Sequence, residues 1–315
     1  MASLIDIRRR LRSLRSTQQI TRAMKMVAAA KLRRAQDRAI ASRPYAKLLR
    51  EVLASVSARV TEPKHPLLAS REEKRVTLMI VAGDRGLAGA FNANVHRTVL
   101  ALLAEKRGWE SVTILPIGKK ALDYWKRRAK LLAPKSYPGI FARVEYAHAK
   151  EIAAYLATEF TENRTDAVYF VVNEFKSVIA QTVRIVRVLP IERGQAAVRV
   201  VTIERGHAAE GVLPAERGQT AVTEASGERL ADFIYEPDAE TILARLLPRY
   251  LEFGVFRALL ESAAAEHAAR MTAMDSASRN AGELIDSLTL TYNRARQARI
   301  TKELIEIVSG SAAQE

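Results

Sequence analysis

The sequence predicts a chain with two structural parts: a long antiparallel two-helix coiled coil of the N- and C-terminal helices, and an open α/β sheet domain inserted between them. Apolar residues recur at steps of three and four near both ends of the chain, a spacing typical of a coiled-coil seam. The middle of the chain alternates short apolar runs with helical segments, which is typical of α/β folds. We expect coiled-coil helices over 1–60 and 236–315, the α/β domain over 71–190, and an insertion with a return strand over 191–235.

The N-terminal helix is predicted by the absence of glycine and proline from Ser3 to about Arg43. Ser3 and Asp6 stand where a cap and a first-turn acid favour helix initiation. We expect Pro44 to kink or briefly interrupt the helix, because proline lacks a backbone N–H. The seam, looser in its second half, consists of Leu4, Ile7, Leu11, Leu14, Met24, Ala28, Leu32 and Ala35.

Basic residues dominate the first fifty positions. Fourteen arginines and lysines stand there against two aspartates, a net charge of +12 in a chain whose total is +15. Such a stripe favours an acidic partner, either phosphates or a carboxylate-rich protein surface, because the attraction reaches over roughly 8–10 Å at physiological salt. A basic face that is merely solvated is the alternative.

The segment that follows the linker Thr61–Ser70 has the rhythm of an open sheet with an antiparallel edge. Short apolar runs predict buried strands, and the segments between them predict helices. The expected strands are Val76–Ala82, Val112–Ile117 and Ala167–Asn173, with Phe175–Leu189 as a hairpin-like extension. The expected helices run from the turn after the first strand to about Lys106, over Lys119–Arg128 and over Glu145–Thr161.

The turn that contains Gly83, Asp84, Arg85 and Gly86 stands where α/β folds bind phosphates, after a strand and before a helix. Its glycine spacing matches neither the dinucleotide fingerprint nor the P-loop. We therefore interpret it as a structural turn that lets helix and strand pack closely.

A Glu-Arg pair recurs every twelve residues in 191–230, beginning at Glu192, Glu204, Glu216 and Glu228. Four copies this short cannot bury a core in the way a solenoid does. We interpret the segment as a duplicated insertion that forms a mobile or β-hairpin surface excursion. Phe233–Tyr235 is the expected return strand.

The C-terminal helix is expected to open at Pro237, with Asp238 or Glu236 as its cap, and to be kinked early by Pro248. Its seam is rich in alanine and serine, which lets a partner helix approach closely. The seam residues are Phe253, Phe256, Leu260, Ala263, His267, Met271, Met274, Ser278, Ala281, Ile285, Leu288, Tyr292 and Ala295.

Gly282 is the one helix-breaking residue between Phe253 and Val308. A glycine inside a helix costs about 1 kcal/mol relative to alanine, so a single continuous helix is the favoured interpretation. Two ordinary helices with a break at Gly282 are the alternative.

No constellation of residues predicts catalysis. The one carboxylate cluster of the α/β segment, Glu72 and Glu73, is interpreted as an ordinary solvated loop pair. The five histidines are scattered, none at the i, i+4 metal spacing, and the chain has no cysteine. We therefore expect no catalytic residue, no cofactor and no metal site. We also expect no transmembrane segment, because no apolar run approaches the ~20 residues of a membrane span. The arginine-rich start has some features of a transit peptide, but Asp6 and the unbroken helix favour a structural role.

Four motifs together resemble the γ subunit of F-type ATP synthase. Residues 18–32 read QQITRAMKMVAAAKL, and residues 84–87 read DRGL. Towards the other end, residues 268–281 contain AARMTAM and ASRNA, and residues 292–304 read YNRARQARITKEL. The motifs occur in the order of that family, and the resemblance reaches from residue 5 to residue 310.

The resemblance implies a central-stalk rotor that couples proton- or sodium-driven rotation of the membrane c-ring to ATP synthesis or hydrolysis. Its terminal helices would lie inside a ring of three α and three β subunits, which carry the catalytic sites, and its α/β domain near the ε subunit and the c-ring. The chain itself would be non-catalytic and would bind no cofactor and no nucleic acid. The implied location is peripheral, on the cytoplasmic face of the bacterial plasma membrane, with an organellar membrane as the less favoured alternative.

The resemblance also assigns roles to particular residues. Arg296, Gln297, Thr301 and Glu303 match positions that engage the ring, and Met24 and Arg270 match a facing pair in the coiled coil. From the +12 stripe we infer on electrostatic grounds that N-terminal cations face an acidic loop of β. The cations placed in this ring-binding set are Arg8, Arg9, Lys25, Arg33, Arg34 and Arg38.

Two functions from other classes remain as alternatives. A nucleic-acid-binding coiled coil is favoured by the pI of about 10.2 and opposed by an aromatic content of 6%. A small-molecule enzyme built on the α/β domain would need a ligand in the turn that begins at Gly83. The insertion departs from the family pattern, and without cysteine it cannot provide the thiol control of the chloroplast members.

Overall fold

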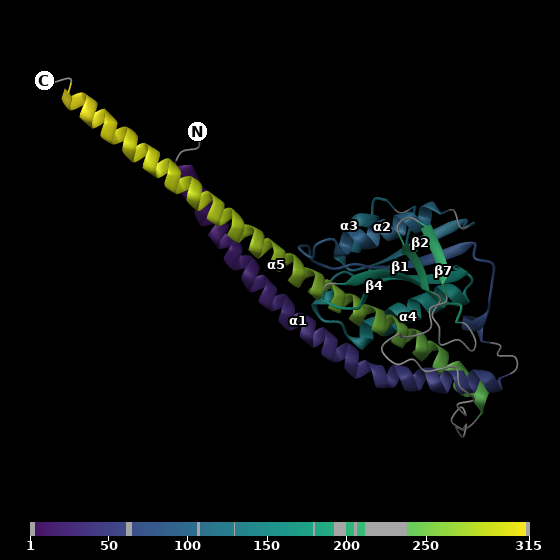
Figure 1. Cartoon of the computed structure of the whole chain (residues 1–315). Coiled ribbons are helices and arrows are strands. Elements are labelled where there is room, and N and C mark those ends of the chain that lie inside the picture. Colours follow the sequence, from purple (N-terminus) through teal and green to yellow (C-terminus); the bar gives the residue numbers. More distant parts are fainter. Residues whose placement is uncertain are drawn as a thin grey trace. The chain divides into compact units, whose positions relative to one another are not determined.

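The structure, a computed structural model, describes residues 4–60, 65–105, 108–128, 130–178, 180–191, 200–204, 207–211 and 238–312 (Figure 1). The chain forms two compact units. Unit 1 comprises Met1–Ala30 and Arg270–Glu315, and unit 2 comprises Lys31–Ala269. Unit 1 is the pair of terminal helix ends, and unit 2 contains the sheet.

Two long helices belong to both units. Helix α1 spans Leu4–Arg59, and helix α5 spans Ala239–Ala312. The α1 helix runs through Pro44, so of the two effects expected of this proline, a kink or a brief interruption, the interruption is excluded. Packing on the next turn explains the continuity: the ring of Tyr45 lies 5.0 Å from that of Phe253, and Ala46 and Leu49 are buried against the same residue.

The start of α5 agrees with the expected cap. The Asp238 carboxylate accepts the backbone N–H of Thr241 at 2.7 Å and its hydroxyl at 2.8 Å, which satisfies a donor that the first helical turn leaves open. These bonds also hold the pKa of Asp238 below its usual value. The helix continues without a break through Pro248 and Gly282, which excludes the alternative of two separate helices.

Unit 2 is built on a mixed sheet with the strand order β3-β2-β1-β4-β5-β6-β7. The pairs β3/β2, β2/β1 and β1/β4 are parallel, and the remaining neighbours are antiparallel, as expected for an open sheet with an antiparallel edge. The strands are β1 Arg75–Val81, β2 Ser111–Ile117, β3 Leu131–Leu132, β4 Ala167–Phe175, β5 Gln181–Leu189, β6 Val200–Glu204 and β7 His207–Gly211.

Helices cover both faces of this sheet (Figure 1). On one face, α2 (Phe91–Ala104) and α3 (Lys119–Trp125) enclose a core that includes Leu78 and Ile80 of β1. On the other face, α4 (Tyr146–Thr161), the end of α1 and the start of α5 enclose a core that includes Met79 and Val81. Alternate residues of β1 thus point into different cores, which explains the continuous apolar run that a strand buried on both faces requires.

Short 3₁₀ helices, η1 Pro66–Leu68 and η2 Ile140–Ala142, complete the connections. Part of the insertion is described: β6 and β7 form an antiparallel hairpin on the β5 edge, which is the β-hairpin form of the two that we expected. The return strand expected at Phe233–Tyr235 and most of the twelve-residue repeat lie outside the described residues.

Candidate functional site

The helix pair of unit 1 is held together by a seam of small and apolar residues. Ile7, Leu11 and Ala28 of α1 are buried, and so are Met274 and Ala281 of α5. Along both helices the less exposed positions recur every three and four residues, which is the pattern predicted for the seam. The pair therefore owes its cohesion to a narrow stripe and leaves most of its surface uncovered in this chain.

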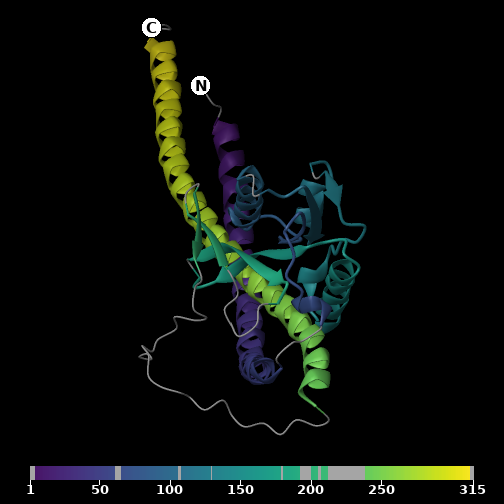
Figure 2. The same cartoon turned by 90° about the vertical axis from the view of Figure 1, so that its right-hand side faces the viewer.

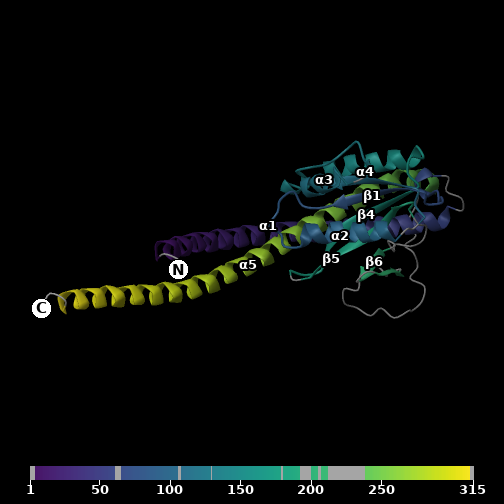
Figure 3. The ribbon, with the colours of Figure 1, turned by 90° about the horizontal axis from the view of Figure 1, so that it is seen from above.

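Polar contacts across the pair set its direction and register. Arg8 donates to the Tyr292 hydroxyl at 2.7 Å, and Lys25 pairs with Asp275 at 2.6 Å. Residue numbers rise along α1 as they fall along α5, so the helices are antiparallel. The N-terminal end of α1 and the C-terminal end of α5 accordingly lie at the same end of the pair (Figures 2 and 3).

Gly282 has a packing role in this pair. A Cβ atom at Gly282 would lie 3.0 Å from Nε2 of Gln18, and that amide donates to the backbone oxygen of Ser278 at 3.4 Å. The missing side chain thus makes room for a polar residue of the facing helix. Glycine is tolerated here because the close approach offsets part of its helix penalty.

The cross-helix contacts also shift the titration of their groups. The hydrogen bond from Arg8 lowers the pKa of Tyr292, and the hydrogen bond from Lys25 lowers the pKa of Asp275. In both cases the cation favours the ionised form of its partner.

Large apolar side chains are exposed on the same unit. On α1 more than half of the surface of Ile5, Ile20, Met26 and Val27 is accessible. The exposed apolar side chains of α5 are Leu284, Leu290, Ile300, Leu304 and Ile305. Apolar groups gathered on one narrow helix pair typically mark a surface that a protein partner covers.

Nine of the predicted partner-binding residues lie in unit 1. Arg8 and Lys25 are engaged with Tyr292 and Asp275, so their charges also serve the pair itself. Glu303 pairs with Arg299 of its own helix at 2.8 Å. Met24 and Arg270 are half-buried, and the exposed members of the set are Arg9, Arg296, Gln297 and Thr301.

The remaining three, Arg33, Arg34 and Arg38, form what we call the basic triad, on the part of α1 that belongs to unit 2. All three are exposed. Within the part of the chain that the structure describes, no carboxylate lies within ion-pair distance of them. Three like charges within two helical turns repel one another, and an acidic partner would relieve that repulsion.

The turn after β1 is organised by Asp84. Its carboxylate accepts backbone N–H groups from Lys119 and Gly139 at 2.8 Å each, and from Phe141 at 2.9 Å. One side chain thus ties the loop after β1 to the loop after β2 and to η2. Sequence reasoning identified the turn as structural but missed this role, because the three donors lie 35 to 57 residues away.

Two glycines allow close packing beside this turn. A Cβ atom at Gly83 would lie 2.8 Å from the carboxylate of Glu266, a buried residue of α5. Gly118 has a φ of 88°, and a Cβ there would lie 2.0 Å from the backbone oxygen of Ala82. Helix α5 thus approaches the backbone at Gly83 closely.

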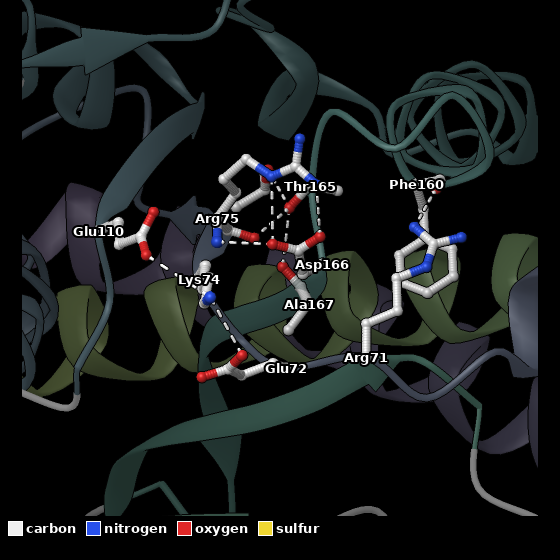
Figure 4. Close-up of polar contacts among 10 residues, drawn as sticks. Arg71, Glu72, Lys74, Arg75, Glu110, Phe160, Thr165, Asp166 and Ala167 are labelled. Atoms are coloured by element: carbon white, nitrogen blue, oxygen red, sulfur yellow. Dashed lines mark hydrogen bonds and ion pairs between the residues drawn. The ribbon is translucent and has the colours of Figure 1, made fainter.

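A second polar cluster joins the N-terminal ends of the parallel strands β1 and β4 (Figure 4). The buried Asp166 carboxylate accepts the backbone N–H of Arg75 at 2.8 Å and its guanidinium at 3.2 and 2.8 Å. These hydrogen bonds hold the pKa of Asp166 below its usual value. Thr165 adds hydroxyl hydrogen bonds to the backbone oxygens of Arg75 and Ala167.

The pair Glu72 and Glu73 differs from expectation. We interpreted both as solvated loop residues, but Glu73 accepts a hydrogen bond from Tyr169 at 2.7 Å and pairs with Arg187 at 2.8 Å. Both partners are sheet residues about a hundred positions away, which no local sequence pattern reveals.

In the described ranges no group of three or more histidine, aspartate or glutamate residues is placed to hold a metal ion. Likewise, none of the described helices is long and apolar enough to span a membrane.

Comparisons with known proteins agree with this architecture. The family model described as ATP synthase matches residues 3–313. The ATP synthase gamma chain of Solibacter usitatus is 48% identical, with 100% of both chains covered, and that of Anaeromyxobacter sp. strain K is 45% identical, with 99% of both covered.

Among solved structures, a chain of the central stalk and c-ring structure of Tetrahymena thermophila mitochondrial ATP synthase is 25% identical, with a TM-score of 0.56 and coverage of 82% of this chain and 99% of that one. A chain of Euglena gracilis mitochondrial ATP synthase shares the fold with a TM-score of 0.61 at 21% identity, covering 99% of this chain and 94% of that one. The chain therefore belongs to the ATP synthase gamma chain family, the non-catalytic rotor subunits of the central stalk.

Proposed function

We propose that unit 1 is the part of the rotor that turns inside a ring of three α and three β subunits and passes torque to their catalytic sites. The observation that carries this proposal is the surface of the helix pair. A narrow seam holds the two helices together, while large apolar side chains, arginines and lysines stay exposed around it. A shaft enclosed by a protein sleeve needs this distribution, because the sleeve covers the apolar groups.

The tip of the shaft is a single helix. A cross-helix hydrogen bond near the tip joins Arg8 to Tyr292, and α5 continues from there to Ala312. The C-terminal end of α5 extends past the start of α1 in each view (Figures 1, 2 and 3). Thr301 and Glu303 lie on this extension, so they would meet the ring without interference from α1. The register of the Arg8–Tyr292 and Lys25–Asp275 contacts places Arg296 and Gln297 where the extension begins, beside the start of α1.

The mechanism follows from asymmetry. A pair of unequal helices presents a different face to each of three equivalent ring sites. A site in contact with the exposed apolar face and a site in contact with a charged face differ in conformational free energy, and hence in nucleotide affinity. Rotation of the shaft by proton- or sodium-driven movement of the c-ring then moves each site through the sequence of affinities.

The basic triad would face an acidic loop of the β subunit. Its three cations are exposed, and in the described ranges no carboxylate of this chain pairs with them. Complementary charge at such a contact would steer the shaft and fix its register more than it would add affinity. Unit 2 would contact the ε subunit and the c-ring, and the chain would then lie peripherally on the cytoplasmic face of a bacterial plasma membrane.

Reconstitution tests the proposal. The purified chain is mixed with matching α and β subunits, and the mass of the complex and its ATP hydrolysis are recorded together, with the chain alone and the αβ subunits alone as controls. One copy per three αβ pairs, with steady hydrolysis that needs all three components, is the expected result. Absence of association, with the chain retained instead on duplex DNA at physiological salt, would refute the rotor function.

A further inference from the structure

A hollow on the outer face of unit 2 lies between the neighbouring helices α2 and α3. It has a volume of about 620 Å³, and its walls include Arg97 of α2 and Lys120, Tyr124 and Arg128 in and just after α3. The lining runs along both helices, from Asn92 to Leu100 on α2 and from Lys120 to Arg128 in and after α3. Neither the seam of unit 1 nor the basic triad contributes a residue to it.

The charges around the hollow are unbalanced. Arg97, Lys120 and Arg128 contribute three cations, and Asp123 is the one carboxylate among the residues that line it. In the described structure none of these four side chains has an ion pair. By contrast, several arginines of the sheet strands form ion pairs with carboxylates: Arg75–Asp166, Arg184–Glu174 and Arg187–Glu73.

The wall behind the cations is rigid. Buried His96 accepts a hydrogen bond from the Trp125 indole at 3.2 Å and stacks on Tyr124 with 4.0 Å between ring centroids and an angle of 3°. The Arg128 guanidinium lies 4.2 Å from the centre of the Tyr124 ring and donates to the backbone oxygen of that residue at 3.2 Å. Arg128 is therefore held in place before any ligand arrives, which reduces the entropy lost on binding.

We propose that this hollow is a binding site for a small oligophosphate, with the phosphate chain bridging Arg97, Lys120 and Arg128. Guanidinium groups match phosphate oxygens in charge and geometry, and a lysine adds a mobile point charge. A single monovalent anion would engage fewer of the three cations than a chain of two phosphates. Burial together with the charge of Arg128 lowers the pKa of His96 to about 4, so this wall is uncharged at neutral pH and the cations supply the attraction.

Direct binding to the full chain tests this site. Inorganic pyrophosphate is titrated into the protein by calorimetry at low salt, and ADP and inorganic phosphate are titrated in parallel. We expect one pyrophosphate per chain, weaker binding of inorganic phosphate, and affinity that falls as salt rises. Equal affinity for pyrophosphate and ADP would mean that the site recognises the phosphate chain alone. Tighter binding of ADP would mean that the phosphate chain bound at this site belongs to a nucleotide.

Substitutions locate the binding. Arg97→Gln and Arg128→Gln should each weaken pyrophosphate binding roughly three- to fivefold, the effect typical of losing one exposed ion pair. Arg127→Gln is the matched control, since this exposed residue neighbours Arg128 but does not line the hollow. Equal affinities in the wild type and in all three variants, or no binding of pyrophosphate to the wild type, would overturn the proposal. The rotor function does not depend on either outcome, because this assay uses the isolated chain.

Discussion

Replacing Asp166 by asparagine should destabilise unit 2 by about 2–3 kcal/mol. The carboxylate accepts three hydrogen bonds from Arg75, two at Oδ2 and one at Oδ1. An asparagine oxygen at the Oδ2 position keeps two of them without the negative charge, while the NH₂ group faces the donor of the third. Hydrogen bonds to charged groups contribute about 1.5–3 kcal/mol each. The Asp166 side chain is 6% exposed but that of Arg75 is 47% exposed, so water replaces part of the loss and keeps the total well below the sum.

Tryptophan fluorescence during urea unfolding measures this effect. Both tryptophans of the chain, Trp109 and Trp125, lie in unit 2, so the signal follows the unit that contains the cluster. With a urea m-value of about 3 kcal/mol/M, the midpoint should fall by roughly 0.7–1 M. Asp37→Asn is the control, because Asp37 is exposed on α1. A midpoint for Asp166→Asn equal to that of the control at pH 7 would refute the reasoning.

The pH dependence provides a second test of the same cluster. The hydrogen bonds from Arg75 lower the pKa of Asp166 below its ordinary value of 3.8. A carboxyl group whose pKa is lower in the folded state stabilises that state fully above the unfolded pKa and loses the contribution as the pH falls through the folded pKa. The difference in free energy of unfolding between wild type and Asp166→Asn should thus stay constant from pH 8 to about 5 and shrink below about pH 4. A gap that persists at pH 3 would show that the carboxylate charge is not its source.

Three further outcomes are expected. Gly118→Ala should lower the free energy of unfolding of unit 2 by about 3 kcal/mol or more, measured by urea unfolding. The added Cβ would lie 2.0 Å from the backbone oxygen of Ala82, and the φ of 88° disfavours any side chain. A double-mutant cycle on Lys25 and Asp275 should give a small favourable coupling that fades in high salt, and a coupling independent of salt would contradict an exposed ion pair. Neutralising the basic triad to glutamine should reduce ATPase coupling and rotation more at low than at high salt, and unchanged activity over a salt series would remove the acidic β loop as its partner.

The spacing of apolar residues correctly predicted much of the two long helices. The spacing of Leu4, Ile7 and Leu11 predicted which face of α1 packs against the partner helix, because an apolar stripe is removed from water only when another element covers it. The continuous apolar run of β1 likewise predicted a strand buried on both faces. Periodicity and local tendency were insufficient at Glu73 and for the choice between a kink and an interruption at Pro44, because contacts from distant residues decide both.

The sequence by itself determined the class of fold, the antiparallel helix pair and, through its motifs, the family, because these depend on local periodicity and on the order of segments. Only the tertiary structure decided that Asp84 ties three loops, that Asp166 locks β1 to β4, and that unpaired cations meet between α2 and α3. These arrangements join residues far apart in the chain. Their energies depend on distances that the folded backbone sets, and a single sequence records no trace of such distances.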